Sequence, residues 1–211
     1  MMHNSFLNEA FDSQAMDSRL QWMHPPTSWR VDSGRSRLVI ESDAETDFWQ
    51  RTHYGFQRDN GHFLYCAAPE NAVVTAQFHS YTAHQYDQAG LMVRFSETCW
   101  LKTSVEFEPE GPSQLGAVVT NHGYSDWSLQ DLSAPSGDGC LSYCLRVQLQ
   151  GAEVLVEHSA GETGPWRLIR VARLFPDPGS KATCGIYACS PQSAGYRAEV
   201  DFLRIDLAQR P

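Results

Sequence analysis

The stretch QAGLMVRF, residues 88–95, is separated by a short loop from CWLKTSVEF, residues 99–107, and these two segments decide the fold. In both, apolar and polar side chains alternate with a period of two, which is typical of β-strands with one buried face. A loop of three residues, Ser96-Glu97-Thr98, aligns the apolar positions on one face of an antiparallel hairpin. These positions are Ala89, Leu91, Val93 and Phe95 in the first segment and Cys99, Leu101, Val105 and Phe107 in the second. We expect this face to fill the interior of the protein.

The opposite face of the hairpin carries polar and aromatic side chains. The same alignment predicts three cross-strand pairs, which are Gln88 with Glu106, Met92 with Lys102, and Arg94 with Trp100. Lys102 and Glu106 project from the same side of one strand at about 13 Å. We predict that this face reaches solvent and holds a ligand stacked on Trp100. The alternative is a solvated sheet surface whose charges pair only with one another.

Similar short segments recur along the chain between glycine, proline and small polar residues. We expect further strands near residues 28–31, 37–41, 62–67, 72–79, 115–121, 141–149, 152–158, 166–174, 183–189 and 197–206. Only the segment from Asn8 to Ser18 has a helical pattern. Many short strands without strand–helix alternation indicate an all-β sandwich or barrel. No linker divides the chain, so we expect a single domain over residues 1–211.

The composition fits a packed globular domain, because 42% of the residues are hydrophobic and only 19% are charged. A formal net charge of -9 removes the attraction on which nucleic-acid binding depends, so we expect no nucleic-acid partner. The apolar runs are no longer than a strand, and the first twenty residues lack a basic segment followed by an apolar one. We therefore expect no membrane partner.

The cysteines and the standard motifs argue against metal and cofactor chemistry. Without a secretory signal, we expect reduced thiols and a cytoplasmic protein. The cysteine spacings lack a second CxxC or an HxxxH, so we expect no metal ligands among them. A structural calcium ion on the rim is left open. The chain has no GxSxG elbow, phosphate-binding loop, dinucleotide fingerprint or HExxH motif, and we expect no cofactor.

Several ordered motifs in the chain resemble those of one family of concanavalin A-like domains. They are Thr46-Asp47-Phe48-Trp49, Thr52-His53-Tyr54-Gly55-Phe56, residues 86–94, Trp100-Leu101-Lys102, Glu106, Ser125-Asp126-Trp127-Ser128 and residues 185–191. This family includes the fungal regulation-of-enolase protein, and the resemblance spans about residues 20–206. It implies a jelly-roll sandwich of two antiparallel sheets with a curved face that receives sugars in proteins of similar fold. It also implies a role around carbon metabolism, without fixing a reaction.

These observations predict a concave ligand face. Its candidate residues are Gln88, Arg94, Trp100, Lys102 and Glu106 on the hairpin, rimmed by Trp49, His53, Asp87, Asp126 and Trp127. We place Asp126 and Trp127 in a connection after the strand that ends near Thr120. The alternative is an Asx-type turn with Trp127 packed on the core. His53 could donate a hydrogen bond or act as a general base, although a lone histidine is more often structural.

The segment Glu41-Ser42-Asp43-Ala44-Glu45 resembles the E-x-D-x-E signature of jelly-roll endoglucanases. Its spacers are not apolar and it runs into a loop, so we assign no catalytic residue. Three functions stay open: a non-catalytic binding module for a carbohydrate or small polyol, a glycan-active enzyme that uses Glu106, and an adaptor for a protein partner in carbon metabolism. We expect Glu106→Gln or Lys102→Met to weaken ligand binding about tenfold while stability is unchanged.

Overall fold

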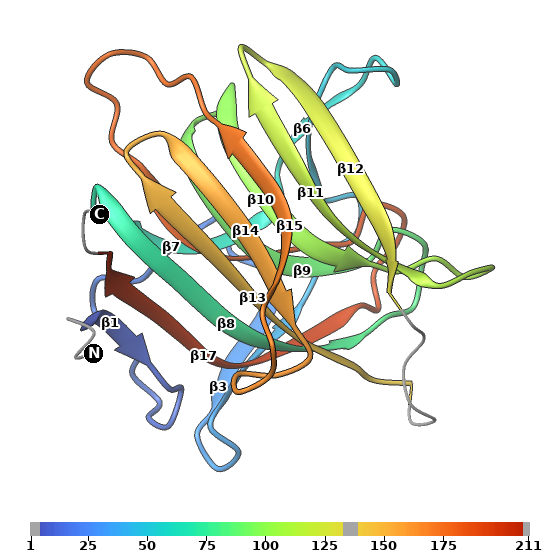
Figure 1. Ribbon diagram of the computed structural model, residues 1–211. Coiled ribbons are helices and arrows are strands. Elements are labelled where there is room, and N and C mark those ends of the chain that lie inside the picture. Colours follow the sequence, from blue (N-terminus) through green and yellow to red (C-terminus); the bar gives the residue numbers. More distant parts are fainter. Residues whose placement is uncertain (1–4, 133–138, 209–211) are drawn as a thin grey trace.

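The computed structural model describes residues 5–132 and 139–208, and every regular element in these ranges is a β-strand (Figure 1). The strands are β1 Ser5–Glu9, β2 Gln21–Met23, β3 Ser28–Asp32, β4 Arg37–Glu41, β5 Phe48–Gln50, β6 Gln57–Asp59, β7 His62–Ala67, β8 Asn71–Tyr81, β9 Gln88–Ser96, β10 Cys99–Glu106, β11 Ser113–Asn121, β12 Tyr124–Leu132, β13 Leu141–Gln150, β14 Glu153–Ser159, β15 Arg167–Arg173, β16 Thr183–Cys189 and β17 Arg197–Leu207. The predicted all-β class is confirmed. In the described ranges, no helix is long and apolar enough to cross a membrane.

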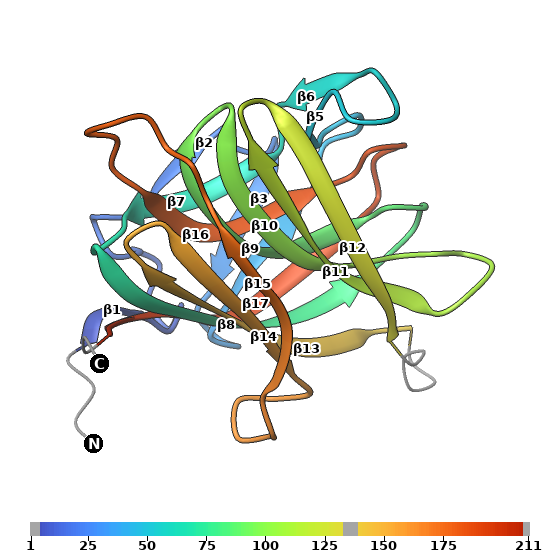
Figure 2. The same ribbon diagram turned by 45° about the horizontal axis from the view of Figure 1, so that its top comes forward.

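Two large antiparallel sheets pack against each other as a sandwich (Figures 1 and 2). Sheet A has the strand order β15-β14-β13-β8-β17-β4-β3, and β1 pairs with β17 beside this path. Sheet B has the order β12-β11-β10-β9-β16-β7-β2. A third, small sheet consists of β5 and β6. This architecture confirms the predicted concanavalin A-like sandwich.

The register of the β9–β10 hairpin agrees with the sequence prediction. Ser96 pairs with Cys99, so the predicted three-residue loop is wrong, and the ladder is irregular between Cys99 and Trp100. Beyond this irregularity, Gln88 lies opposite Glu106, Met92 opposite Lys102, and Arg94 opposite Trp100, as predicted. This agreement follows from parity, because a shift of one residue would turn every apolar side chain of the hairpin toward the wrong face.

The main hydrophobic core lies between the two sheets. Leu91, Leu101 and Val105 are buried in it, as predicted. Phe107 is only half-buried, so its assignment to the core is wrong. The reason is that β10 ends one residue earlier, and the backbone of Phe107 bonds to the turn before β9, through the Tyr86 N–H and the Asp87 carbonyl.

The predicted helix between Asn8 and Ser18 is wrong. Residues 5–9 form β1, which pairs with β17 and buries Leu7 in the core. The chain after β1 is irregular because the Glu9 carboxylate accepts hydrogen bonds from the backbone N–H groups of Phe11 (2.8 Å) and Asp17 (2.6 Å). A side chain that bonds to nearby backbone in this way competes with a helix.

The prediction that Asp126 and Trp127 lie in a connection is also wrong. They belong to β12, which pairs along its length with β11 and places Trp127 opposite Val118. The link between the two strands is only His122-Gly123, and both residues have positive φ, 53° and 76°. Two such residues are typical of the tight turns that match the twist of a β-hairpin.

Candidate functional site

A cleft of about 390 Å³ opens on the outer face of sheet B. Its floor consists of side chains from β9, β10, β11 and β12, and one wall consists of the β5–β6 hairpin and its connecting loop. The cleft is lined by Glu45, Asp47, Trp49, Tyr54, Phe56, Arg58, Tyr86, Gln88, Lys102, Glu106, Val118, Trp127, Pro191 and Gln192. We refer to this hollow as the cleft.

The β5–β6 hairpin packs on sheet B through a second apolar cluster and two ion pairs. Phe48 and Trp49 of β5 pack with Trp100 and neighbouring apolar side chains of the sheet. At one end of the hairpin, the Arg94 guanidinium donates to both carboxylate oxygens of Asp59, at 2.7 and 2.8 Å. At the same end, Lys102 pairs with Asp47, the residue before Phe48. The hairpin therefore covers much of the face that the sequence predicted to be open.

Lys102 is at the centre of a buried hydrogen-bond chain in the floor. Its Nζ donates to Asp47 Oδ1 at 2.8 Å and to Gln88 Oε1 at 3.0 Å. The hydroxyl of Tyr187 donates to the same oxygen of Gln88 at 2.9 Å. Burial disfavours the ammonium, but the nearby carboxyl groups, first Asp47 and then Glu106, contribute to an opposing effect that raises the pKa of Lys102 overall. Lys102 is therefore charged and already paired before a ligand arrives.

Glu106 differs from Lys102 because its carboxyl has no hydrogen-bond or ion-pair partner in the part of the chain that the structure describes. Only 6% of the residue is exposed, and it lines the cleft. Among the described residues, none makes a hydrogen bond or an ion pair with its side chain. Burial raises the pKa of Glu106 to about 7, although the nearby Lys102 opposes this shift. At neutral pH this carboxyl can either donate or accept a hydrogen bond with a molecule in the cleft.

The wall of the cleft is a cluster of aromatic rings. The centroid of Trp49 lies 5.5 Å from Tyr54, 6.3 Å from Phe56 and 6.0 Å from Trp127. Tyr54 and Phe56 are 55% and 42% exposed, so the wall presents aromatic surface to solvent. The loop that carries them turns sharply, with positive φ at Arg51 and His53.

The structure brings five of the predicted site residues together, and their binding role stays a prediction. Those that line the cleft are Trp49, Gln88, Lys102, Glu106 and Trp127.

Two predicted residues of the hairpin face lie beneath the β5–β6 hairpin instead. Trp100 is fully buried, where it packs against Phe48 and donates from Nε1 to the Glu97 carbonyl at 3.0 Å. The expectation that Trp100 reaches solvent is therefore wrong. Arg94 forms an ion pair with Asp59 and does not line the cleft.

The other three predicted residues also lie outside the lining of the cleft. Asp87 is fully buried and accepts hydrogen bonds from the backbone N–H groups of Ala83 and His84, so it closes the turn before β9. His53 is exposed, with its ring against Tyr54. Asp126 pairs with Arg170 at 2.8 Å on the opposite side of β12 from Trp127.

Sequence reasoning missed nine residues of the cleft, which are Glu45, Asp47, Tyr54, Phe56, Arg58, Tyr86, Val118, Pro191 and Gln192. Several of them stand inside the motifs that carried the family resemblance. Asp47 could have been found by a physical argument, because a lysine on a sheet face that becomes covered needs a carboxylate partner. The two strands of the hairpin are too short for a period of two to be recognised.

The segment from Glu41 to Glu45 does not form a catalytic carboxylate group. Only Glu45 lines the cleft. Glu41 lies in β4, and the Asp43 carboxylate accepts hydrogen bonds from the backbone and hydroxyl of Thr27 at 3.1 Å. Within the described ranges, no group of three or more His, Cys, Asp or Glu side chains is placed to hold a metal ion. None of the six cysteines, all of which lie in the described ranges, forms a disulfide.

The chain belongs to the family described as "Protein of unknown function (DUF1349)", whose model matches residues 22–208. It is 35% identical over 179 residues to "Regulation of enolase protein 1" of Saccharomyces cerevisiae, and the match covers 83% of each chain. The resemblance that the sequence motifs indicated is thereby confirmed.

Solved structures support the same fold. A crystal structure of a functionally unknown protein from Saccharomyces cerevisiae matches with a TM-score of 0.80 and 28% identity, over 92% of this chain and 98% of that chain. A xylan β-1,4-xylosidase from Bacillus halodurans matches with a TM-score of 0.74 and 12% identity, over 94% of this chain and 38% of that chain. At so low an identity, the second match establishes only the fold.

Proposed function

We propose that the protein is a binding module whose cleft holds a neutral carbohydrate or a related small polyol without catalysing a reaction on it. The observation that carries the proposal is the juxtaposition of the aromatic wall with Glu106, a buried carboxyl that no side chain within residues 5–132 and 139–208 satisfies. Sugars present apolar C–H faces and many hydroxyls, so they match a site with both features. The volume of the cleft, about 390 Å³, is within the range of small-molecule sites.

The charges of the lining residues favour a neutral ligand over an anionic one. The carboxylates are Glu45, Asp47 and Glu106, and the cations are Arg58 and Lys102. Because Lys102 is already paired with Asp47, it offers little attraction to a phosphate or a carboxylate. Sugar phosphates and uronic acids would also approach Glu45 and Glu106. We therefore expect uncharged sugars to bind and their phosphorylated forms to be excluded.

A small ligand panel tests this proposal. Isothermal titration calorimetry with xylose, xylobiose, glucose, cellobiose and glycerol should find at least one ligand with a Kd below about 1 mM. Glucose 6-phosphate and glucuronic acid share the ring of glucose but carry a negative charge, so they serve as charged controls and should bind more weakly than glucose. The absence of binding by every neutral sugar and polyol would overturn the proposal.

A glycan-active enzyme on the same scaffold is the second candidate, and the partnerless Glu106 favours it. A carboxyl with a pKa of about 7 can act as a general acid or base at neutral pH. The distinguishing measurement is turnover. Release of reducing ends from xylobiose or cellobiose by the wild type, abolished in Glu106→Gln, would favour the enzyme over the binding module.

A regulatory role in carbon metabolism, through a protein partner such as a metabolic enzyme, is suggested by the name of the yeast relative. The adaptor role would be favoured if such an enzyme co-purified with the protein from cell extract and stayed bound when sugars occupied the cleft. We propose a cytoplasmic location, because six cysteines without a disulfide between them are typical of a reducing compartment.

A further inference from the structure

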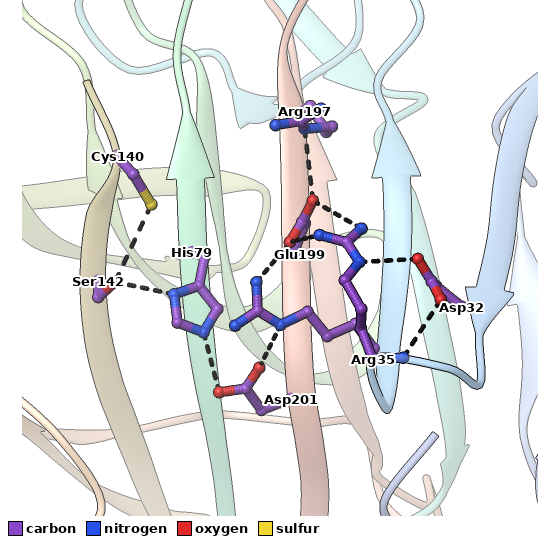
Figure 3. Close-up of polar contacts among 9 residues, drawn as sticks. Asp32, Arg35, His79, Cys140, Ser142, Arg197, Glu199 and Asp201 are labelled. Atoms are coloured by element: carbon purple, nitrogen blue, oxygen red, sulfur yellow. Dashed lines mark hydrogen bonds and ion pairs between the residues drawn. The ribbon is translucent and has the colours of Figure 1, made fainter. Parts of the chain in front are cut away.

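A second cluster of polar side chains lies on the outer face of sheet A, which is the far side of the sandwich from the cleft (Figure 3). It contains a hydrogen-bonded chain of a serine, a histidine and an aspartate. Ser142 Oγ lies 2.8 Å from His79 Nδ1, and Asp201 Oδ2 lies 2.9 Å from His79 Nε2. The three residues come from the neighbouring strands β13, β8 and β17.

The sheet register explains how these side chains meet. Ser142 lies directly opposite His79 across the β13–β8 ladder. On the other side of β8, the register of β17 shifts between Val200 and Phe202, which leaves Asp201 as an extra residue. This β-bulge puts the Asp201 carboxylate on the outer face beside the histidine. Bulges interrupt a ladder and re-aim a side chain, and they are enriched next to active sites.

The hydrogen bonds also assign the protons. Asp201 is partly buried, yet His79 and Arg37 lower its pKa, so the carboxylate is ionised. An ionised carboxylate can only accept, and it therefore holds the proton of His79 on Nε2. In the neutral form of His79, the other nitrogen, Nδ1, then has a free lone pair, which accepts a hydrogen bond from the hydroxyl of Ser142. A hydroxyl that donates to a basic nitrogen held in place by a third group has the arrangement of an activated nucleophile.

The surroundings of the cluster are balanced in charge. Three guanidinium groups, those of Arg35, Arg37 and Arg197, converge on Glu199. The carboxylates of Asp32 and Asp201 complete the set. With as many carboxylates as guanidinium groups, the cluster does not select for a charged substrate. Ser142 itself is exposed.

We propose that Ser142 is a nucleophile that accepts acyl groups from small uncharged carboxylic esters, with His79 as its general base and Asp201 as the positioning residue of His79. In the first step Ser142 Oγ attacks the ester carbonyl while its proton passes to His79 Nδ1. The tetrahedral adduct then releases the alcohol, which takes that proton, and leaves an acyl-serine. Water attacks the acyl-serine by the same route, and the carboxylic acid leaves with Ser142 restored.

The open position on a sheet face leads us to expect slow turnover, so covalent labelling is the more sensitive readout. An alkyl fluorophosphonate reacts by the same attack, with fluoride as the leaving group and the proton on His79. Intact-protein and peptide mass spectrometry should show one adduct, on Ser142. Loss of the general base in His79→Gln should slow labelling at least ~100-fold. Asp201→Asn should also slow it, and p-nitrophenyl acetate hydrolysis should fall in parallel.

Two controls keep the test decisive. The thiol of Cys140 lies 4.0 Å from Ser142 Oγ, so Cys140→Ser shows whether the thiol contributes, and its labelling should match the wild type. Each variant is compared only after its urea unfolding curve shows a folded protein. An adduct on Cys140, equal labelling of many serines, a rate unchanged in His79→Gln, or no adduct on the folded wild type would each overturn the proposal.

Discussion

The ammonium of Lys102 lies 2.8 Å from the carboxylate of Asp47, and this pair joins the middle of sheet B to the segment that enters the β5–β6 hairpin. Both side chains are largely buried, with exposed fractions of 2% and 14%. The pair therefore positions the aromatic wall over the floor of the cleft. It also argues against the sequence-based expectation that Lys102 could be replaced without loss of stability.

We predict that Lys102→Met lowers the free energy of unfolding by about 3–5 kcal/mol, because it leaves the Asp47 carboxylate buried without its partner. Urea denaturation measures this change. Lys181 is an exposed lysine and provides the matched control, so Lys181→Met should change stability by no more than about 0.5 kcal/mol. Equal, small effects of the two substitutions would show that the Lys102 pair does not stabilise the fold.

Arg94→Ala should also be costly, by about 3 kcal/mol, because Asp59 would lose the guanidinium that binds both of its oxygens. Burial raises the pKa of Asp59, and Arg94 opposes that shift, so the substitution should raise the pKa further. Arg58→Ala, at the exposed neighbouring arginine, is the control in the same urea experiment. A loss at Arg94 no larger than that at Arg58 would contradict this assignment.

Glu106 should make stability fall as pH rises. Its pKa is raised by burial from 4.5 to about 7 in the folded protein, so between these values the native state holds a proton that the unfolded state has released. Stability is therefore full below about pH 4.5 and declines up to about pH 7, by on the order of 3 kcal/mol. Urea curves of wild type and Glu106→Gln at pH 5 and pH 8 isolate this effect. The two proteins should differ in their pH dependence, and parallel curves would refute the assignment.

Leu101→Ala should cost about 2–5 kcal/mol, because the side chain is fully buried between the sheets. Phe107→Ala should cost less despite the larger ring, because Phe107 lies half-buried beyond the end of β10. This ranking is the reverse of what side-chain size alone predicts. Thermal unfolding of the two variants under one buffer condition decides it, and a larger loss at Phe107 would place that ring in the core after all.

The fold was predictable from sequence where a strand is long and has one buried face. The β9–β10 register followed from parity because the strands are nine and eight residues long and pair without a break from Trp100 to Glu106. The β11–β12 hairpin was missed because β12 is largely exposed and gives little apolar alternation. Its tight turn at His122-Gly123 was the available signal.

The candidate site was less predictable than the fold, because its form depends on contacts between distant segments. Parity correctly put Trp100 and Lys102 on one face, but parity cannot show what covers that face. The β5–β6 hairpin buries Trp100 and supplies Asp47, and its strands have only three residues each. Asp47 and Lys102 are separated by 55 residues in the sequence, so no local sequence pattern predicts that they form an ion pair.

The central claim is that the cleft holds a neutral sugar against its aromatic wall, and one calorimetric comparison tests it most directly. The neutral sugar that binds the wild type most tightly is titrated into Trp127→Ala, whose indole lines the cleft, and into Trp29→Ala, whose indole is exposed on β3 of sheet A. We predict that Kd rises at least tenfold, or about 1.4 kcal/mol, in Trp127→Ala and is unchanged in Trp29→Ala. An equal Kd for wild type and a folded Trp127→Ala would contradict the claim.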